Sequence, residues 1–355
     1  MYKVLSTFTG GGGFDIGFHG DFLFLGDNYP RLKFKTIASI DINADAVNSV
    51  LKNTKYFTGN KAFHGDILTF DKANFPSEEF DVLLGGFPCV TFSMVGKRLG
   101  VSDDINGKLY LSFASYVEEF KPKVFIAENV KGILSANKGL ALKEIIKRFK
   151  ETGYRLHVYS VNFAKLGVPQ QRERVLFVGV RDNIKIPFIA PRITHPNKSK
   201  FITTLEAFDG VQVVPFNNEM VRHNPKTIER IASIPEGGNF KDLPIQFRMK
   251  AVMSNIYRRL HRHEPAYTVV ASGGGGTWTY HYEYPRALTN RERARLQSFP
   301  DDFNFQGSIT EVRRQIGNAV PPIGVYPFAT SVQNLLDGLV PVIHGDEYPE
   351  YVAKL

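Results

Sequence analysis

The sequence has little cysteine, little tryptophan and no long apolar run. Of its 355 residues, one is cysteine, Cys89, and one is tryptophan. A single cysteine excludes an internal disulfide and a zinc site of the CxxC type, so a reducing cytoplasm is the expected compartment. No apolar run reaches the roughly 18 residues that span a bilayer, and the first residues lack the basic and apolar regions of a signal peptide. We therefore expect no membrane partner and no metal.

The charge balance is basic, with 44 Lys and Arg residues against 35 Asp and Glu residues and a formal net charge of +9. A basic chain suits a polyanionic partner, of which nucleic acid is the commonest, although many soluble proteins are mildly basic for no special reason. The hydrophobic fraction of 43% and the charged fraction of 22% are those of a soluble globular protein. The length allows one large domain or two ordinary ones.

Short apolar runs alternate with helix-like segments in the first half of the chain. The runs that predict strands are residues 2–8, 34–40, 62–67, 80–86, 123–129 and 174–180. The segments that predict helices are residues 43–53, 109–120, 140–150, 286–303 and 323–340, of which 286–303 is expected to be amphipathic and ended by proline. Interleaving of this kind predicts an α/β fold with a doubly wound, mostly parallel sheet. Such sheets bind ligands at the carboxyl ends of their strands.

The pattern changes near residue 186, where prolines and polar turns begin to break up the periodicity. This change predicts two domains. The larger would consist of residues 1–185 plus 310–355, and a smaller, irregular one of residues 186–309.

Glycines and carboxylates follow the expected strands. The glycines of FTGGGGFDIGF, residues 8–18, let the backbone approach a ligand in front of a helix N-terminus, although they also suit a simple tight turn. Asp41 ends the second strand and Asp66 ends the third. A carboxylate in such a place accepts hydrogen bonds from ribose hydroxyls, or else caps the next helix. Three such strand ends in succession indicate a nucleoside pocket.

Reactive side chains follow the next strands. Cys89 lies in the corner GGFPCVTFS, residues 85–93. A lone cysteine is usually an inert apolar side chain, but a nearby cation favours the thiolate, a potent nucleophile. Glu128 ends the fifth strand, where it would serve either as a cap or as an acid or hydrogen-bond partner. Arg172 and Arg174 precede the sixth strand, where they would stabilise a thiolate or an anion.

Six segments, in this order, resemble the motif set of the DNA cytosine-C5 methyltransferases of bacterial and phage restriction–modification systems. They are FTGGGGFDIGF, GGFPCVTFS, AENVKGIL, QQRERVLFVGVR, RALTNRERARLQSFPDDF and RQIGNAVPP. The resemblance covers residues 2–180 and 286–330. The glycine loop alone is weak evidence, whereas the PC corner, ENV, QRER and QIGNAVPP in this order are highly specific.

The resemblance implies a Rossmann-like S-adenosylmethionine-dependent methyltransferase fold and a covalent mechanism. The Cys89 thiolate would add to C6 of a flipped-out cytosine, which makes C5 nucleophilic. Glu128 would protonate or hydrogen-bond N3, and Arg174 would contact the carbonyl oxygen of the base, with Arg172 supporting the pocket. The methyl group then moves to C5, and loss of the C5 proton expels the cysteine. The product of the cofactor is S-adenosylhomocysteine.

The same resemblance implies a cofactor site and a DNA site. The implied cofactor contacts are Phe8, Gly10, Gly12, Asp41, Ile42, Asp66, Ile67, Leu109, Asn318 and Val320. Asp41 would hold the ribose hydroxyls and Asp66 the adenine amino group. Residues 91–108 would form a loop that closes over the flipped base, and the irregular domain would read base edges in the major groove of double-stranded DNA. The candidate DNA contacts are Ser93, Lys97, Arg98, Arg258, Arg259 and Thr268.

Further expectations concern the setting of the enzyme. We expect a monomer in the bacterial cytoplasm that requires no stable protein partner. It would be either an orphan methylase or one paired with a restriction endonuclease encoded nearby. The recognised DNA site does not follow from the sequence.

Three positions depart from the commonest family pattern. Val90 stands where glutamine often follows the cysteine, Ser6 replaces a frequent aspartate, and Thr9 replaces serine. None of these changes removes a reacting group.

Three rival interpretations account for part of the pattern. A nicotinamide-dependent oxidoreductase would explain the glycine loop and Asp41, but not PC, ENV and QRER together. A tRNA cytosine methyltransferase shares the catalytic set, yet the CFT signature of those enzymes is missing and the sizeable irregular domain favours DNA. A non-catalytic DNA-binding regulator would not need to keep Cys89, Glu128 and Arg174.

Overall fold

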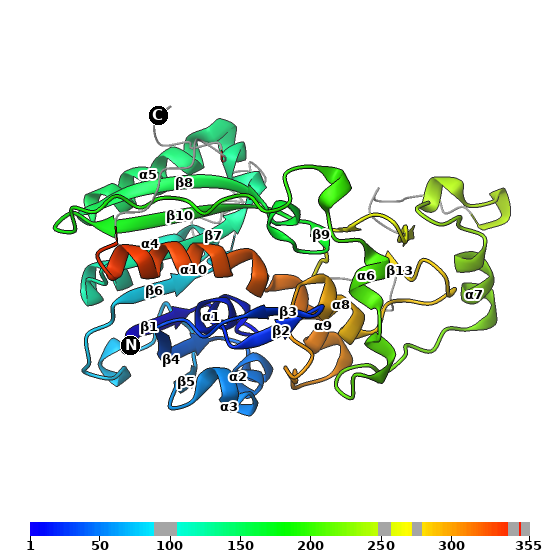
Figure 1. Cartoon of the computed structure of the whole chain (residues 1–355), viewed down its shortest axis with the longest axis horizontal. Coiled ribbons are helices and arrows are strands. Elements are labelled where there is room, and N and C mark those ends of the chain that lie inside the picture. The colour runs from blue at the N-terminus through cyan, green and yellow to red at the C-terminus, as the bar shows by residue number, and fades with distance from the viewer. Residues whose placement is uncertain (89–104, 248–256, 272–278, 340–347, 349–355) are drawn as a thin grey trace.

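The computed structural model describes residues 1–88, 105–247, 257–271, 279–339 and 348, with the backbone alone for residues 105–108. Within these residues the chain forms an α/β sheet domain and a smaller, irregular part beside it (Figure 1). In this described part, no helix is long and apolar enough to cross a membrane.

A seven-stranded sheet, in the order β5-β4-β1-β6-β7-β10-β8, forms the centre of the described part. Its strands in chain order are β1 (Tyr2–Thr7), β4 (Phe34–Asp41), β5 (Lys61–His64), β6 (Val82–Gly85), β7 (Val124–Val130), β8 (Tyr154–Asn162) and β10 (Glu173–Arg181). The first five strands of the spatial order pair in parallel, whereas β10 runs antiparallel to both β7 and β8. The predicted mostly parallel sheet is confirmed.

Helices cover both faces of this sheet. They are α1 (Gly13–His19), α2 (Ala44–Lys52), α3 (Thr54–Phe57), α4 (Ile105–Phe120), α5 (Leu140–Glu151) and α10 (Pro322–Leu336). Successive strand residues point to opposite faces, so Leu84 packs in one core with Phe18 of α1 and Phe328 of α10. Leu83 packs in the other core, with Phe113 of α4. Both leucines are fully buried, as expected for a parallel sheet covered on both faces.

The irregular part contains short elements. They are the β2–β3 hairpin (Phe22–Phe24 and Asp27–Tyr29) on its border, β9 (Gln170–Gln171), α6 (Thr204–Phe208), α7 (Pro225–Ala232), β11 (Arg258–Arg259), β12 (Ala266–Tyr267) and β13 (Thr279–Tyr280). Single 3-10 turns lie in both parts of the molecule. Those before residue 186 are Lys72–Asn74, Lys131–Leu134, Ala136–Gly139 and Phe163–Leu166, and those after it are Lys198–Lys200, Val211–Val213, Phe240–Asp242 and Ile245–Phe247. A small separate core, which includes Ile231, Ile234 and Tyr280, holds the outer portion together.

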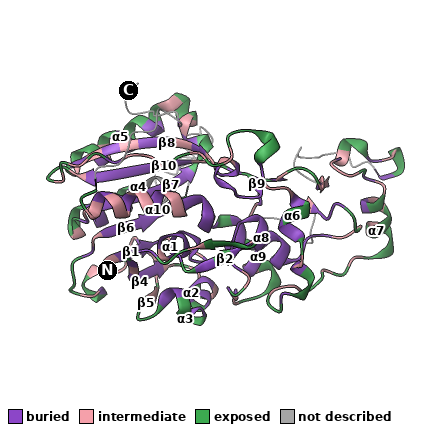
Figure 2. Ribbon diagram, in the orientation of Figure 1, coloured by how far each residue is buried: buried purple, intermediate pink, exposed green. Residues whose placement is uncertain are grey.

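The predicted helix at residues 286–303 is wrong in length and in character. The structure has α8 (Asn290–Leu296), followed later by α9 (Ile309–Asn318). A capping box between Thr289 and Glu292 starts α8, and Ser298, at a φ of 60°, turns the chain away before the proline. The helix is not amphipathic, because all seven of its residues are buried (Figure 2).

The segment around α8 shares the core of the sheet domain. Leu296, Phe299 and Phe305 belong to the same buried cluster as Phe14 and Val325. The expected domain boundary after residue 309 therefore crosses a continuous core, and α8 joins the irregular part to the sheet.

Candidate active site

A cavity of about 450 Å³ opens at the carboxyl edge of the sheet. The last residues of β1, β4 and β7 and the residues that follow β1, β4 and β6 line it on one side, and residues 314–315 and 317–320 close it on the other. Because β10 is antiparallel, its first residues also reach this edge: Arg174 is paired with Val130, the last residue of β7. The sheet thereby gathers five strand termini around one cavity.

The glycine loop after β1 forms one wall. Phe8 and Gly10 line the cavity, and both have positive φ values, of 52° and 54°. A Cβ added at Gly10 would meet no atom within 4 Å, so the space beside this residue is open. A Cβ added at Gly12 would lie 2.5 Å from the ring of Phe57. Gly12 is therefore required by packing beneath the loop and does not line the cavity.

Asp41, at the end of β4, has its carboxylate fixed by the backbone. Its Oδ2 accepts a hydrogen bond from Gly10 N at 2.7 Å, and its Oδ1 accepts one from Asn43 N at 2.8 Å. Burial raises the pKa of Asp41, and these two backbone donors oppose that rise. Each carboxylate oxygen accepts more than one hydrogen bond, so Asp41 keeps acceptor capacity for hydroxyl groups in the cavity. The neighbouring Ile42, 67% exposed, offers an apolar surface there.

Glu128 and Arg174 form an ion pair at the cavity wall, with Arg174 Nε 2.7 Å from Glu128 Oε1. Both side chains are largely buried, at 9% and 12% exposure. The register explains the contact: Glu128 is paired with Leu176, and Arg174, two residues earlier on β10, points to the same face. The other oxygen, Oε2, lies where a Cβ at Gly86 would be only 3.4 Å away. A glycine at this position leaves room beside the carboxylate.

The chain that leads to the cysteine is anchored at this cavity. Asn129 Nδ2 donates to the carbonyl oxygen of Phe87 at 3.1 Å. Phe87 and Pro88 line the cavity, and Pro88 is the last described residue before Cys89. Four of the predicted site residues lie outside the described residues: Cys89, Ser93, Lys97 and Arg98.

Arg172 is 1% exposed and acts on the backbone around the cavity. Its Nη1 donates to the carbonyl of Val269 at 3.1 Å, and its Nη2 donates to the carbonyls of Gly317 and Ala319 at 3.1 and 3.0 Å. Burial and the nearby positive charge of Arg174 lower its pKa. Arg172 therefore supports the pocket by joining three segments.

The cavity collects most of the predicted cofactor residues, but not all of them. Those that line it are Phe8, Gly10, Asp41, Ile42, Asn318 and Val320. Asp66 accepts a hydrogen bond from Leu68 N at 2.9 Å within its own turn. Ile67 and Leu109 pack with the core on the face of the sheet covered by α4 and α5. These three residues are not among those that line the cavity.

Several residues that line the cavity were not predicted. They include Thr7, Phe14, Asn43, Asn129, Arg314 and Gln315. Asn129 and Gln315 lie inside segments already singled out, AENV and RQIGNAVPP, so their position was available from the sequence but their orientation was not. Asn43 is the N-cap of α2, where its side chain accepts from Ala46 N.

The described DNA-contact candidates already have partners within the protein. The Arg259 guanidinium donates to the carbonyls of Ile234, His281 and Glu283. The Arg258 guanidinium lies 4.3 Å from the centre of the Tyr267 ring. Thr268 Oγ1 donates to the carbonyl of Gln171 at 2.7 Å. Arg259 thus has a structural role, whatever it contacts in DNA.

Ser6, which replaces a frequent aspartate of the family pattern, is explained by its contact with the carboxylate of Asp15. Ser6 Oγ and Thr36 Oγ1 donate to the two carboxylate oxygens of Asp15, each at 2.8 Å. Asp15 is 1% exposed, and burial raises its pKa to about 6. A carboxylate therefore still lies beneath the glycine loop, contributed by α1 instead of β1.

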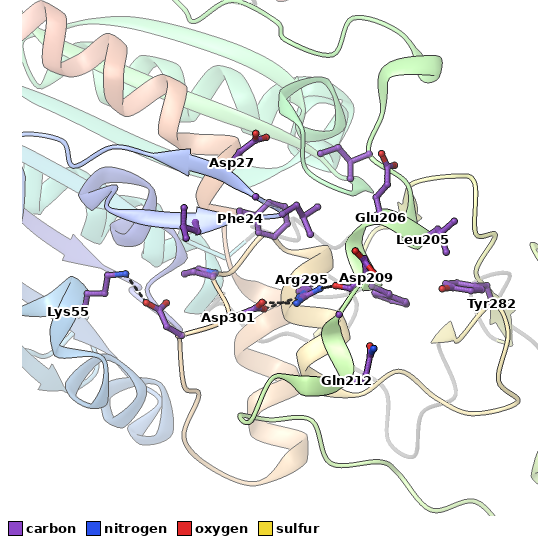
Figure 3. A pocket seen from close by; sticks show the side chains of 18 residues that line it. Phe24, Asp27, Lys55, Leu205, Glu206, Asp209, Gln212, Tyr282, Arg295 and Asp301 are labelled. Atoms are coloured by element: carbon purple, nitrogen blue, oxygen red, sulfur yellow. Dashed lines mark hydrogen bonds and ion pairs between the residues drawn. The ribbon is translucent and has the colours of Figure 1, made fainter.

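A second, larger cavity of about 1210 Å³ lies between the β2–β3 hairpin, α6 and the segment after α8 (Figure 3). Its lining includes the carboxylates of Asp27, Glu206, Asp209, Asp301 and Asp302, two of which pair with Arg295 and Lys55 at 2.7 and 2.8 Å. The excess negative charge disfavours phosphate groups. None of the predicted site residues that the structure describes line this cavity, so the smaller one is the candidate active site.

Two solved structures share this fold. A putative DNA modification methyltransferase encoded within an Escherichia coli prophage superposes with a TM-score of 0.69 at 22% identity, covering 95% of this chain and 100% of that one. The Dnmt2 methyltransferase of S. pombe superposes with a TM-score of 0.65 at 16% identity, covering 95% of this chain and 99% of that one. These likenesses show that the chain has the fold of these two proteins.

Comparisons of the sequence with known proteins define the family. The model of the C-5 cytosine-specific DNA methylases matches residues 2–334. The type II methyltransferase M.NgoFVII of Neisseria gonorrhoeae is 45% identical over 337 residues, which are 93% of this chain and 86% of that protein. M.BbvI of Brevibacillus brevis is 42% identical over 284 residues, or 78% of this chain and 73% of that protein. The chain belongs to the C-5 cytosine-specific DNA methylase family, which excludes the nicotinamide-dependent oxidoreductase.

Replacing Asp15 by asparagine tests the buried carboxylate. A pKa of about 6 in the fold, against 3.8 for an ordinary aspartate, means that the folded state favours the protonated acid. This contribution to stability is complete below about pH 4 and is lost as the pH rises through 6, a change of about 3 kcal/mol for two pKa units. Between pH 4 and 7.5 the unfolding free energy of the wild type should therefore fall relative to Asp15→Asn. Urea titrations at several pH values measure the difference.

The exposed carboxylate Asp182, replaced by asparagine, serves as the control. A difference between wild type and Asp15→Asn that stays constant over this pH range would contradict the raised pKa.

Proposed function

We propose that this protein transfers a methyl group from S-adenosylmethionine to C5 of a flipped-out cytosine in a specific double-stranded DNA sequence. The observation that carries the proposal is the Glu128–Arg174 ion pair, which faces the same cavity as the anchored residues directly before Cys89. An acid, a cation and a nucleophile-bearing loop at one site are what addition of a thiolate to a cytosine ring requires.

The cavity is suited to S-adenosylmethionine. Its volume of about 450 Å³ lies within the usual range of small-molecule sites, roughly 300–1,000 Å³. Asp41 offers spare acceptor capacity for the ribose hydroxyls, Ile42 offers an apolar surface for a ring, and open space borders Gly10. Phe8, Asn318 and Val320 complete the wall. Asp66, Ile67 and Leu109 remain predicted contacts from the neighbouring strand and helix.

The bound cofactor supplies an electrophilic methyl group. The Cys89 thiolate adds to C6 of the cytosine, which pushes negative charge into the ring and makes C5 nucleophilic. Glu128 holds or protonates N3, where that charge develops, and Arg174 stabilises the charge at the carbonyl oxygen of the base. After C5 carries the methyl group, removal of the C5 proton restores the double bond, and the S–C6 bond breaks to release Cys89.

The Glu128–Arg174 pair is arranged to receive a base. Glu128 Oε1 and Arg174 Nε are buried against each other, 2.7 Å apart, which holds both side chains at the cavity wall. The second glutamate oxygen, Oε2, lies beside Gly86, whose lack of a side chain leaves the most room there. A flipped base brought to this position would meet the glutamate on this side.

The irregular part, residues 186–309, is proposed to read the DNA target, with residues 1–185 and 310–355 carrying catalysis. Ser93, Lys97 and Arg98 would contact DNA from the loop beyond Cys89, and Arg258, Arg259 and Thr268 from the irregular part. Contacts of Lys and Arg with phosphate make such binding weaken with salt. We propose that the protein acts as a monomer in the bacterial cytoplasm, where a restriction endonuclease with the same target is the possible companion.

Incubation with tritiated S-adenosylmethionine and mixed-sequence double-stranded DNA tests this function. We expect label in DNA, and none in RNA. The Cys89→Ser variant should bind DNA as the wild type does but lose transfer by roughly 10³-fold or more, because the nucleophile is removed. Label in RNA alone would favour the tRNA methyltransferase, and turnover retained by Cys89→Ser would contradict the covalent mechanism.

The cofactor site is tested separately through Asp41. Asp41→Ala removes a charged acceptor, so the Kd for S-adenosylhomocysteine should rise by about 10- to 100-fold, as expected for a hydrogen bond to an ionised group. Isothermal titration calorimetry without DNA gives this value directly. The control is Asp45→Ala, which removes the next carboxylate along the chain, one that does not line the cavity. Equal losses in both variants, or none in Asp41→Ala, would contradict the assignment.

A further inference from the structure

Two buried glutamines join the irregular part of the molecule to the cofactor wall. Gln170 and Gln297 are both fully buried. Gln170 Nε2 donates to Gln297 Oε1 at 2.6 Å and to the carbonyl of Leu296 at 2.7 Å. These residues are 127 positions apart in the chain. Buried amides of this kind are uncommon unless every polar group finds a partner.

On one side, the network holds Val269 by both of its backbone groups. Val269 N donates to Gln170 Oε1 at 2.9 Å, and the Val269 carbonyl accepts from Arg172 Nη1 at 3.1 Å. The preceding strand β12 pairs with β9, which contains Gln170. Residues 266–271, the segment that carries the predicted DNA contact Thr268, are thereby fixed to the start of β10 and to α8.

On the other side, the same side chains hold the C-terminal end of α9. Gln297 Nε2 donates to the carbonyls of Ile316 and Ala319 at 2.6 and 3.2 Å. Arg172 Nη2 bonds the carbonyls of Gly317 and Ala319, between which Asn318 lies. Asn318 and Val320 line the candidate cofactor cavity.

The two segments also touch directly. A Cβ added at Gly317 would lie 2.3 Å from Ala271 N and 2.4 Å from the Val270 carbonyl carbon. A shift of residues 266–271 therefore has to move the end of α9 or break this close contact. Packed cores respond to such shifts with discrete rearrangements.

We propose that Gln297, acting with Gln170, is a positioning residue that couples binding of DNA to binding of the cofactor. The proposal rests on the proposed function, because it takes the cavity as the S-adenosylmethionine site and the irregular part as the DNA reader. DNA that holds residues 266–271 in this position would, through the two amides, also hold the carbonyls of Ile316 and Ala319 beside the cofactor cavity. By linkage, the cofactor tightens DNA binding by the same factor.

The test compares a single and a double variant. Gln297→Met removes the oxygen that accepts from Gln170 and the donor to the carbonyls of Ile316 and Ala319, which should lower the melting temperature. Gln170→Met/Gln297→Met also removes the partners of Val269 N and of the Leu296 carbonyl, so it should lower the melting temperature further. A purely structural role predicts that a variant that still folds keeps the coupling between DNA and cofactor, whereas a positioning role predicts that the coupling is lost.

The readout is the Kd of S-adenosylhomocysteine, measured by calorimetry with and without saturating unmethylated plasmid DNA. In the wild type we expect DNA to tighten this binding by about 5- to 150-fold, the usual range of coupling between sites. In both variants the ratio should fall to within about twofold of unity. The control is Asn53→Leu, which removes a buried amide bonded to Asn304 and Ser49, away from residues 266–271; it should lose stability and keep the ratio.

Three outcomes would overturn the proposal. The first is a Gln297→Met variant that still folds and keeps the wild-type ratio. The second is a wild type that binds both S-adenosylhomocysteine and DNA with no coupling, which leaves the proposed function standing. The third is a wild type that binds neither, which overturns the proposed function as well.

Discussion

The site depends on one antiparallel strand in an otherwise largely parallel sheet. Parallel strands bring only their carboxyl ends to the ligand edge, where carboxylates and the cysteine corner follow β4, β6 and β7. Because β10 is reversed, its amino end reaches the same edge and places Arg174 2.7 Å from Glu128. The same reversal brings Arg172, two residues earlier, against the carbonyls of residues 269, 317 and 319. A parallel β10 would put both arginines at the opposite end of the molecule.

In the irregular part and at its junction with the sheet, buried and half-buried arginines donate to backbone carbonyls that no helix or strand pairs. Backbone carbonyls that lack a helix or sheet partner still need donors. Arg259 bonds three of them, and Arg291, which is fully buried, bonds the carbonyls of Phe216, Pro300 and Phe303. Arg172 does the same around the cavity. The formal net charge of +9 therefore overstates the positive charge that is available to DNA phosphates.

The sequence predicted the sheet and the strand-end residues well, because buried parallel strands are continuous apolar runs followed by polar corners. It missed β8, in which buried and half-buried residues are interspersed at the edge of the sheet, and it overextended α8. In sequence, seven consecutive buried residues with three arginines do not resemble a core helix. The carbonyls of Phe216, Ala207 and Asp209, which accept from Arg291 and Arg295, are distant in the chain. For the same reason the Ser6–Asp15–Thr36 contact and the Gln170–Gln297 bond were not predictable. A side chain that bonds a group distant in the chain leaves no recognisable pattern in the residues next to it in sequence.

The central claim is that Cys89 attacks C6 of a cytosine bound beside Glu128 and Arg174. It is tested most directly with double-stranded DNA in which 5-fluorocytosine replaces cytosine, because C5 then has no proton to lose and the adduct cannot resolve. Incubation with S-adenosylmethionine, proteolysis and mass spectrometry identify the modified peptide. The account predicts a covalent nucleotide adduct on the peptide that contains Cys89, formed only when the cofactor is present. An adduct on another residue, or none while ordinary cytosine is methylated, would contradict it.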